Sequence, residues 1–316
     1  LVLVIQPSLA AKPHFWNLYS QSLALVTPAP LLLPYRNGPV MSGPRSLDIY
    51  LVWYGKFTDA QKSIVQDFLR SFAAPATGND TRHAISSWWS TTAGYKDSFG
   101  KGVAQVVRLA GEAVDEGAAR GKKLTVMDLE AMVVEHVQKG TFPGSAMALY
   151  LVLTAADVYV DGFCMNSCGF HAYTFPSELA SDKMLPYGWV GNSADQCPGQ
   201  CAWPFAAANF GPKTPPLRPP NGDVGVDGMI INLATIVAGA ATNPYDTGYY
   251  QGDAAAPLES VSACTGIFGK GAYPGYPGEL LTHSVSGASF NAHGINSRRF
   301  LIPAMWNPTS LNCEPL

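Results

Sequence analysis

Hydrophobic residues in this 316-residue chain recur at strand spacing in some segments and at helix spacing in others. The run Leu47–Tyr54 is rich in β-branched and aromatic residues, which predicts a strand. After it, Thr58 and Gln61 form a capping-box pattern at the start of a helix. The apolar face of that helix follows at three- and four-residue spacing: Ile64, Val65, Phe68, Leu69 and Phe72.

The same periodicities predict a second helix that is opened by Thr125 and stopped by Gly140. Its buried face consists of Leu129, Met132, Val133 and Val137. Residues 103–109 and 148–153 are predicted strands, and the uniformly apolar second one is expected in the centre of a sheet. Residues 289–291 and 298–302 predict a closing hairpin.

Residues 229–242 (MIINLATIVAGAAT) carry apolar side chains on nearly every helical face, which predicts a buried central helix. These 14 residues fall short of the roughly 20 that a membrane span needs. Residues 161–211 hold four cysteines among many glycines and prolines, as expected of an irregular lobe held by disulfides. The predicted fold class is therefore α+β, with a mixed sheet over a buried helix and a disulfide-rich irregular lobe.

The N-terminal segment predicts export from the cell. Residues 1–5 are apolar and Ser8-Leu9-Ala10 resembles a cleavage site, so we interpret residues 1–10 as a signal-peptide remnant, with a buried strand as the alternative. Residues 11–44 are punctuated by proline and predict an extended arm or a pro-segment, followed by a single domain over 45–316. Asn79 begins a glycosylation sequon, which agrees with secretion.

Six cysteines agree with an oxidising compartment and predict three disulfides: Cys164, Cys168, Cys197, Cys201, Cys264 and Cys313. Six cysteines allow 15 pairings. We predict that Cys164 pairs with Cys168, Cys197 with Cys201, and Cys264 with Cys313. A four-cysteine zinc site is the alternative, but both short spacings have three intervening residues where metal knuckles usually have two.

Composition limits the partners. The chain is 47% hydrophobic and 14% charged, with a net charge of −3 and no run of Lys or Arg, so no nucleic-acid partner is expected. Asp223, Gly225 and Asp227 faintly resemble a calcium loop that lacks its middle ligand. We prefer the interpretation that Asp227 caps the central helix.

Several blocks resemble the plant EXORDIUM, or phosphate-induced, protein family. They are PNGDVGVDGM at 220–229, LVWYG at 51–55, CGFH at 168–171, WVGNS at 189–193, CPGQCA at 197–202 and PAMW at 303–306. The resemblance runs from about residue 26 to the C-terminal residue. It implies an apoplastic, cell-wall protein linked to brassinosteroid-promoted cell expansion, and it supplies no molecular activity.

Some relatives carry a His-Glu-x-x-Glu segment before Thr-Asn-Pro, which resembles the active-site helix of the zincin metallopeptidases. This chain keeps Thr242-Asn243-Pro244 but has Thr235, Ile236 and Gly239 at the three metal-site positions. Of these three residues, only threonine offers a donor atom, and its hydroxyl is a poor zinc ligand. Glu259 retains a later acidic position, and His171 could be a second ancestral ligand or a structural histidine.

The resemblance therefore implies a zincin-like core without its metal, with no cofactor and no catalytic residue assigned. Residues His171, Glu259, Asp223 and Asp227 are candidates to line a cleft. We expect a non-catalytic binding protein whose ligand is a wall oligosaccharide or a peptide. The alternatives are an extracellular enzyme acting on cell-wall glycan or peptide and a structural wall component; the oligomeric state stays open.

Overall fold

The computed structural model describes residues 31–43, 45–75, 81–165, 167–180, 182–254 and 256–316. Residues Leu32–Leu316 form one compact unit. The predicted signal-peptide remnant, most of the predicted arm and the sequon residue Asn79 lie outside the described residues. Residues 32–43, which we assigned to the arm, belong to this unit; for example, the Met41 amide donates to the Ala241 carbonyl at 2.9 Å.

The longer elements follow the predicted order closely. Strand β1 covers Leu47–Tyr54 and helix α1 covers Asp59–Ser71, with Thr58 and Gln61 forming the predicted capping box. A second capping box at Thr125 opens helix α3. The other elements of five residues or more are α2 (Ile85–Ser90), β2 (Val107–Asp115), α3 (Val126–Gln138), β4 (Ala148–Thr154), β6 (Gly169–Tyr173), β7 (Pro186–Gly191) and α5 (Val224–Thr242).

Shorter elements fill the rest of the unit. They are β3 (Lys123–Leu124), β5 (Tyr159–Val160), α4 (Pro198–Cys201), β8 (Leu281–Thr282), β9 (Ser289–Phe290), β10 (Ala292–His293), β11 (Arg299–Phe300), β12 (Met305–Asn307) and β13 (Asn312–Glu314), with 3-10 turns at Thr81–His83, Thr91–Gly94, Glu178–Ala180, Ser262–Cys264 and Ile295–Ser297.

The main sheet has five strands in the order β2-β1-β4-β7-β6. Four strands are parallel, and the edge strand β6 runs antiparallel to β7. The fully buried β4 lies in the centre, as its apolar sequence predicted. One line of paired residues crosses the sheet from Leu51 through Leu151 and Gly188 to His171. A mixed sheet with a buried helix is therefore confirmed.

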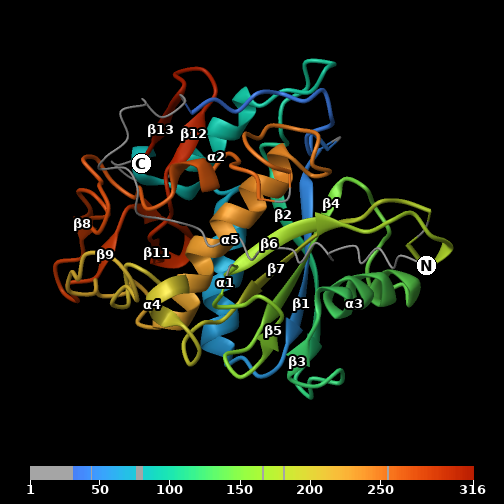
Figure 1. The fold of residues 1–316 in the computed structure, drawn as a ribbon, viewed down its shortest axis with the longest axis horizontal. Helices are drawn as coiled ribbons and strands as arrows, with labels where there is room; N and C mark the ends of the chain where they lie inside the picture. Colours follow the sequence, from blue (N-terminus) through green and yellow to red (C-terminus); the bar gives the residue numbers. More distant parts are fainter. Residues whose placement is uncertain (1–30, 44, 76–80, 166, 181, 255) are drawn as a thin grey trace, which may run out of the picture. The chain divides into compact units, whose positions relative to one another are not determined.

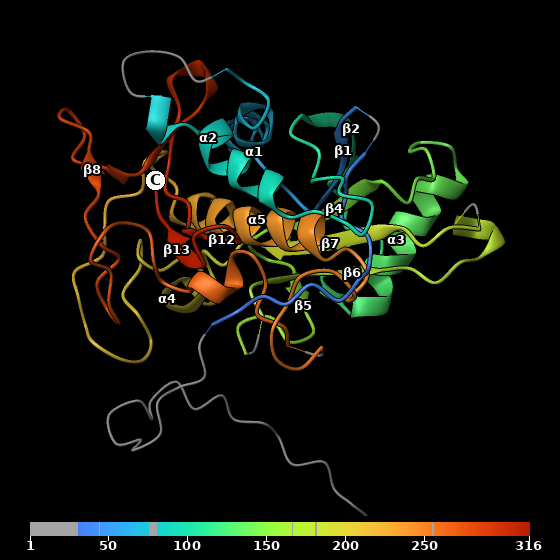
Figure 2. The same cartoon turned by 90° about the horizontal axis from the view of Figure 1, so that it is seen from above.

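Helices cover both faces of this sheet (Figures 1 and 2). Helices α1 and α5 lie side by side on one face, and α3 covers the other face. Helix α5 is buried nearly all round, as predicted, and starts five residues earlier than the sequence indicated. Among the described residues, α5 is long and apolar enough to cross a membrane, but 83% of its most apolar stretch is buried inside the protein, as expected of a core helix.

Two predicted strand segments are wrong in position. The strand placed at 103–109 runs from Val107 to Asp115, because the amides of Val103 and Ala104 bond to loop carbonyls of Tyr95 and Met41 instead of the sheet. The predicted closing hairpin is split between two small sheets. Strand β9 pairs with β8, and β10 pairs with β11.

Trp88 and Trp89 are core residues. They are 2% and 1% exposed, and each indole N–H donates to a buried backbone carbonyl, of Pro303 and Ala104 respectively. Both rings pack edge-on against Phe72 of the segment that ends α1. The tryptophan pair thus joins α1 and α2 to the C-terminal region.

All six cysteines are oxidised, but two of the predicted pairings are wrong. The disulfides are Cys164–Cys197, Cys168–Cys201 and, as predicted, Cys264–Cys313. Cys197 caps α4 and Cys201 ends it, so their side chains stand on one face of a helical turn. Both therefore meet the loop that carries the other two cysteines, and the two bridges run side by side instead of closing five-residue rings.

Candidate functional site

Helix α5 carries the three positions that the sequence analysis compared with a zincin active-site helix. Thr235, Ile236 and Gly239 occupy its second half. Positions 235 and 239 are four residues apart and share a face, while position 236 is turned by about 100° from position 235. The structure accordingly places the three residues in different surroundings.

Ile236 packs into the sheet. A Cβ at Gly188 of β7 would lie 2.8 Å from Ile236 Cγ2, and one at Gly169 of β6 would lie 3.4 Å from Ile236 Cγ1. Gly188 therefore makes room for the isoleucine and lets α5 approach the sheet closely, whereas the distance at Gly169 is that of an ordinary van der Waals contact. A glutamate at this position would place its carboxylate among apolar groups at a high desolvation cost.

Gly239 lies directly against His171 and Glu259. A Cβ at position 239 would lie 2.6 Å from Glu259 Oε2 and 3.1 Å from His171 Nε2. His171 comes from the edge strand β6, and its Nε2 lies 2.8 Å from Glu259 Oε2 and 3.0 Å from Glu259 Oε1. Two of the four predicted cleft residues thus meet beside Gly239 of the helix.

This pair is a buried ion pair. The two side chains are only 7% and 9% exposed. Burial lowers the pKa of His171, but the charge of Glu259 and the hydrogen bond to it outweigh that effect and hold the pKa above its usual value. The imidazolium and the carboxylate therefore neutralise each other inside the protein.

Two neighbours complete the cluster. Asn243 Nδ2 donates to Glu259 Oε1 at 2.7 Å, and the Gly248 amide in turn donates to Asn243 Oδ1 at 2.7 Å. Asp246 is half-buried nearby, where burial and the charge of Glu259 raise its pKa while His171 opposes the change. The Glu259 amide donates to Ser262 Oγ at 2.8 Å, which fixes the turn that carries the carboxylate.

The residues present do not fit a catalytic zinc ion. Such a site needs about three protein ligands and one open position. No group of three or more His, Cys, Asp or Glu side chains in the described part of the chain could hold a metal ion. His171 and Glu259 bond to each other, and Gly239 supplies no donor atom. No metal-dependent step is therefore derived for this chain.

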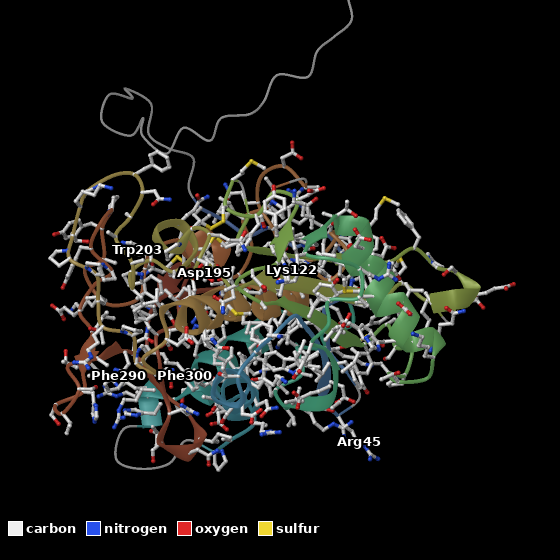
Figure 3. All side chains as sticks on the ribbon, turned by 90° about the horizontal axis from the view of Figure 1, so that it is seen from below. Arg45, Lys122, Asp195, Trp203, Phe290 and Phe300 are labelled. Carbon is white, nitrogen blue, oxygen red and sulfur yellow. A yellow bond between two sulfur atoms is a disulfide. The ribbon has the colours of Figure 1, made fainter. Side chains whose placement is uncertain are left out.

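Thr235 lies apart from this cluster, at the wall of a cavity of about 260 Å³. Its hydroxyl donates to the Ile231 carbonyl within α5 at 3.1 Å, so its lone pairs can still accept. Trp203, labelled in Figure 3 on the segment after α4, and Ser262 line the same cavity. A half-buried indole beside hydroxyl and amide groups can bind a small polar ligand.

Asp223 and Asp227 lie at the opposite end of α5 and are not part of the His171 cluster. Asp223 is the N-cap, and its carboxylate accepts from the Val226 amide at 3.0 Å. The prediction that Asp227 caps the helix is therefore wrong. Asp227 lies one turn inside, 1% exposed, and accepts from the side chain and the backbone of Asn221 at 2.6 and 2.9 Å. Burial raises its pKa to about 7.

Together the fold and this cluster define a disulfide-bonded α+β protein with a buried histidine–glutamate pair at its central helix. The model of the family described as phosphate-induced protein 1 conserved region matches residues 33–316, and the chain belongs to this family.

The curated relatives cover most of the chain. It is 44% identical to Protein EXORDIUM-like 2 of Arabidopsis thaliana over 93% of this chain and 92% of that protein. It is also 44% identical to Protein PHOSPHATE-INDUCED 1 of Nicotiana tabacum, over 90% of this chain and 88% of that protein, and to Protein EXORDIUM of Arabidopsis thaliana, over 90% and 89%. No solved structure matches.

Neither Asn243 nor Gly188 was predicted from the sequence as a site residue. Asn243 belongs to the Thr-Asn-Pro motif that served only to align the helix, although it holds Glu259 in place. Gly188 is a strand glycine, a residue type that signals close approach of another backbone or side chain. Both residues can be read from the sequence, but the residues that they contact, Glu259 for Asn243 and Ile236 for Gly188, cannot be identified without the fold.

Proposed function

We propose that this protein is a secreted, cell-wall protein of the apoplast that acts by non-catalytic binding, on a zincin-like scaffold that has lost its metal. The observation that carries the proposal is the His171–Glu259 ion pair against Gly239. A histidine and a carboxylate that could each bind a metal instead satisfy each other, 2.8 Å apart. Brassinosteroid-linked growth regulation is the physiological role that the family resemblance suggests.

The surroundings of the pair favour a structural role over catalysis. A general base or a metal ligand must reach a substrate or hold an open position. Both partners are nearly fully buried, and the glutamate also accepts from Asn243. The pair is thus positioned to hold the edge strand β6 against α5 without taking part in a reaction.

Three disulfides support export. Such bonds form and persist in oxidising compartments and are rare in the cytosol. The two side-by-side bridges tie the loop before β6 to α4, and the third ties residue 264 to residue 313. All three therefore hold segments outside the main sheet, and each limits the freedom of the unfolded chain.

The cavity beside Thr235 is the place where we expect a ligand. It lies one helical turn from Gly239, and it offers an indole face and several hydroxyl groups. These groups suit a wall oligosaccharide or a peptide. An enzyme acting on wall glycan or peptide remains the alternative function.

The test uses protein purified from its native tissue. We expect metal analysis to find less than 0.1 zinc per chain, and we expect no cleavage of a broad peptide library with or without added zinc. Stoichiometric zinc, or chelator-sensitive cleavage that His171→Ala abolishes, would overturn the proposal. Asp48→Asn, at the Arg108 ion pair on the surface, is the control for loss of one charged side chain elsewhere, and the fraction of folded His171→Ala is measured by circular dichroism under the assay conditions.

A further inference from the structure

A second cavity, of about 430 Å³, lies at the N-terminal end of α5, away from the residues discussed so far. Its size falls within the range of small-molecule sites, about 300–1,000 Å³. It is formed where α1, the loop before α5 and the C-terminal segment meet, and its lining is polar: Ser63, Asp67, Pro220, Asn221, Asn296, Ser297, Arg298 and Arg299.

Arg298 is held rigidly at this cavity. Its Nε donates to Asp67 Oδ2 at 3.0 Å, and the Asp67 residue is only 4% exposed. Its two terminal nitrogens donate to Asn221 Oδ1 at 3.3 Å and to Ser63 Oγ at 3.2 Å. A buried carboxylate and two neutral acceptors therefore fix the plane of the guanidinium before any ligand arrives.

This arrangement leaves donors for a ligand. A guanidinium carries five N–H donors, and the three bonds described use three of them. Two N–H groups remain on the terminal nitrogens of a side chain that is 27% exposed. A guanidinium with two remaining donors in one plane matches the two oxygens of a carboxylate.

The charge of the cavity also suits a single negative group. Arg299 lines it as well, and its guanidinium lies 5.5 Å from the centre of the Phe290 ring. Figure 3 labels Phe290, together with Phe300 of the same C-terminal part of the fold. The charged residues that line the cavity are Arg298, Arg299 and Asp67, so the lining carries one net positive charge.

The backbone of the cavity is strained at two adjacent residues. Asn296 and Ser297 have φ angles of 52° and 58°, in the left-handed region that non-glycine residues rarely occupy. Asn296 Nδ2 donates to Asp67 Oδ1 at 2.9 Å, which helps to hold this conformation. Such strain persists where surrounding contacts enforce it, and it is concentrated at ligand sites. Both side chains are exposed at the cavity and offer an amide and a hydroxyl.

We propose that this cavity binds a carboxylated sugar, a uronic acid residue of an oligosaccharide. The two free N–H groups of the Arg298 guanidinium donate to the planar carboxylate, and Arg299 adds positive charge. The side chains of Asn221, Asn296 and Ser297 form hydrogen bonds with the sugar hydroxyls. A phosphate group shares the anionic chemistry but carries more charge and more acceptor oxygens than this lining matches. The site is independent of the Thr235 cavity and of the proposed loss of metal.

The test is isothermal titration of the full chain with trigalacturonate, with the neutral galactose trimer of the same linkage, and with inorganic phosphate. We expect trigalacturonate to bind at least tenfold more tightly than either comparison ligand, with an affinity that falls as salt is added. Arg298→Lys keeps the charge but loses the planar fork, and should weaken binding about tenfold.

Because Arg298 also stabilises Asp67, Arg299→Gln provides a variant that leaves that ion pair intact. We expect it to weaken binding at least fivefold, roughly the loss of one charged contact. The matched control is Arg36→Gln, because Arg36 also lies over an aromatic ring, that of Tyr250 at 4.9 Å, near the other end of α5. It should bind as the unchanged protein does.

Three outcomes would overturn the proposal. One is equal binding of the charged and neutral trimers, and another is equal loss in the Arg299→Gln and Arg36→Gln variants. The third is phosphate binding as tight as that of trigalacturonate, which would show a general anion site. Zinc content and peptide cleavage do not enter this test, so its result is separate from that of the proposed function.

Discussion

His171 Nε2 of the edge strand β6 lies 2.8 Å from Glu259 Oε2, although 88 residues separate them in the chain. The contact passes beside Gly239 of α5, whose missing side chain leaves the space that the two charged groups occupy. Three segments are thereby joined at one buried point: the sheet edge, the central helix and the loop after it.

Breaking this pair should destabilise the protein strongly. His171→Ala or Glu259→Gln leaves one buried polar group without its charged partner, which typically costs about 3–5 kcal/mol. Urea denaturation of each variant measures the change in free energy of unfolding. Asp48→Asn, at the exposed pair with Arg108, should change it by less than about 1 kcal/mol. Equal effects at the two sites would contradict the assignment of a buried ion pair.

Gly239→Ala should be destabilising, contrary to the usual effect of this change. Inside a helix, alanine is normally favoured over glycine by about 0.5–1 kcal/mol. Here the new methyl group would meet Glu259 Oε2 at 2.6 Å, and overpacking of this kind costs about 1–3 kcal/mol. Thermal unfolding shows whether Gly239→Ala lowers or raises the melting temperature. A Glu259→Ala background should remove most of the penalty, and an increase in melting temperature for Gly239→Ala alone would refute the close contact.

Stability should fall as pH rises from about 4 to about 7 because of Asp227. Its folded-state pKa of about 7 lies above the value near 3.9 of an unfolded aspartate, so the native state binds the extra proton between these values. The bound proton therefore contributes its full stabilisation at pH values below the unfolded-state pKa, and this contribution is lost as the pH rises through the folded-state pKa of about 7. Roughly three pH units at about 1.4 kcal/mol each give a loss of up to about 4 kcal/mol.

Asp227→Asn isolates this effect, because it keeps the size of the side chain and removes the titration. Denaturation midpoints of this variant, measured across the same pH range, should be flatter than those of the unchanged protein. Asp161→Asn replaces an exposed acid after β5 and should leave the slope unchanged. Parallel slopes for all three proteins would show that Asp227 does not hold the proton.

Peptide mapping without reduction should recover Cys164 joined to Cys197 and Cys168 joined to Cys201. Each bridge spans 33 residues, which corresponds to about 4 kcal/mol in the chain-entropy estimate, whereas a bridge within each short pair would give about 2 kcal/mol. The double variant Cys164→Ser with Cys197→Ser should lose a few kcal/mol yet keep the second bridge. Recovery of Cys164 joined to Cys168 would contradict the pairing.

Local sequence patterns were sufficient for the elements that depend on neighbouring residues. The capping boxes at Thr58 and Thr125, the strand Leu47–Tyr54 and the buried helix all follow from side chains a few residues apart. The spacing of hydrophobic residues did not predict the bounds of β2 correctly. Its polar residues reflect an edge strand that is half exposed, and such a strand lacks a continuous apolar pattern.

The sequence by itself determined that positions 235, 236 and 239 of the central helix carry Thr, Ile and Gly, of which one is a poor metal ligand and two supply no donor atom. Only the tertiary structure decided that His171 and Glu259 neutralise each other beside Gly239, that the disulfides cross between two segments, and that Asp223 instead of Asp227 caps α5. Each of these facts depends on a sheet register or a helix packing that brings distant residues within bonding distance. Contacts of this kind leave no local pattern, since burial and partner choice are properties of the whole fold.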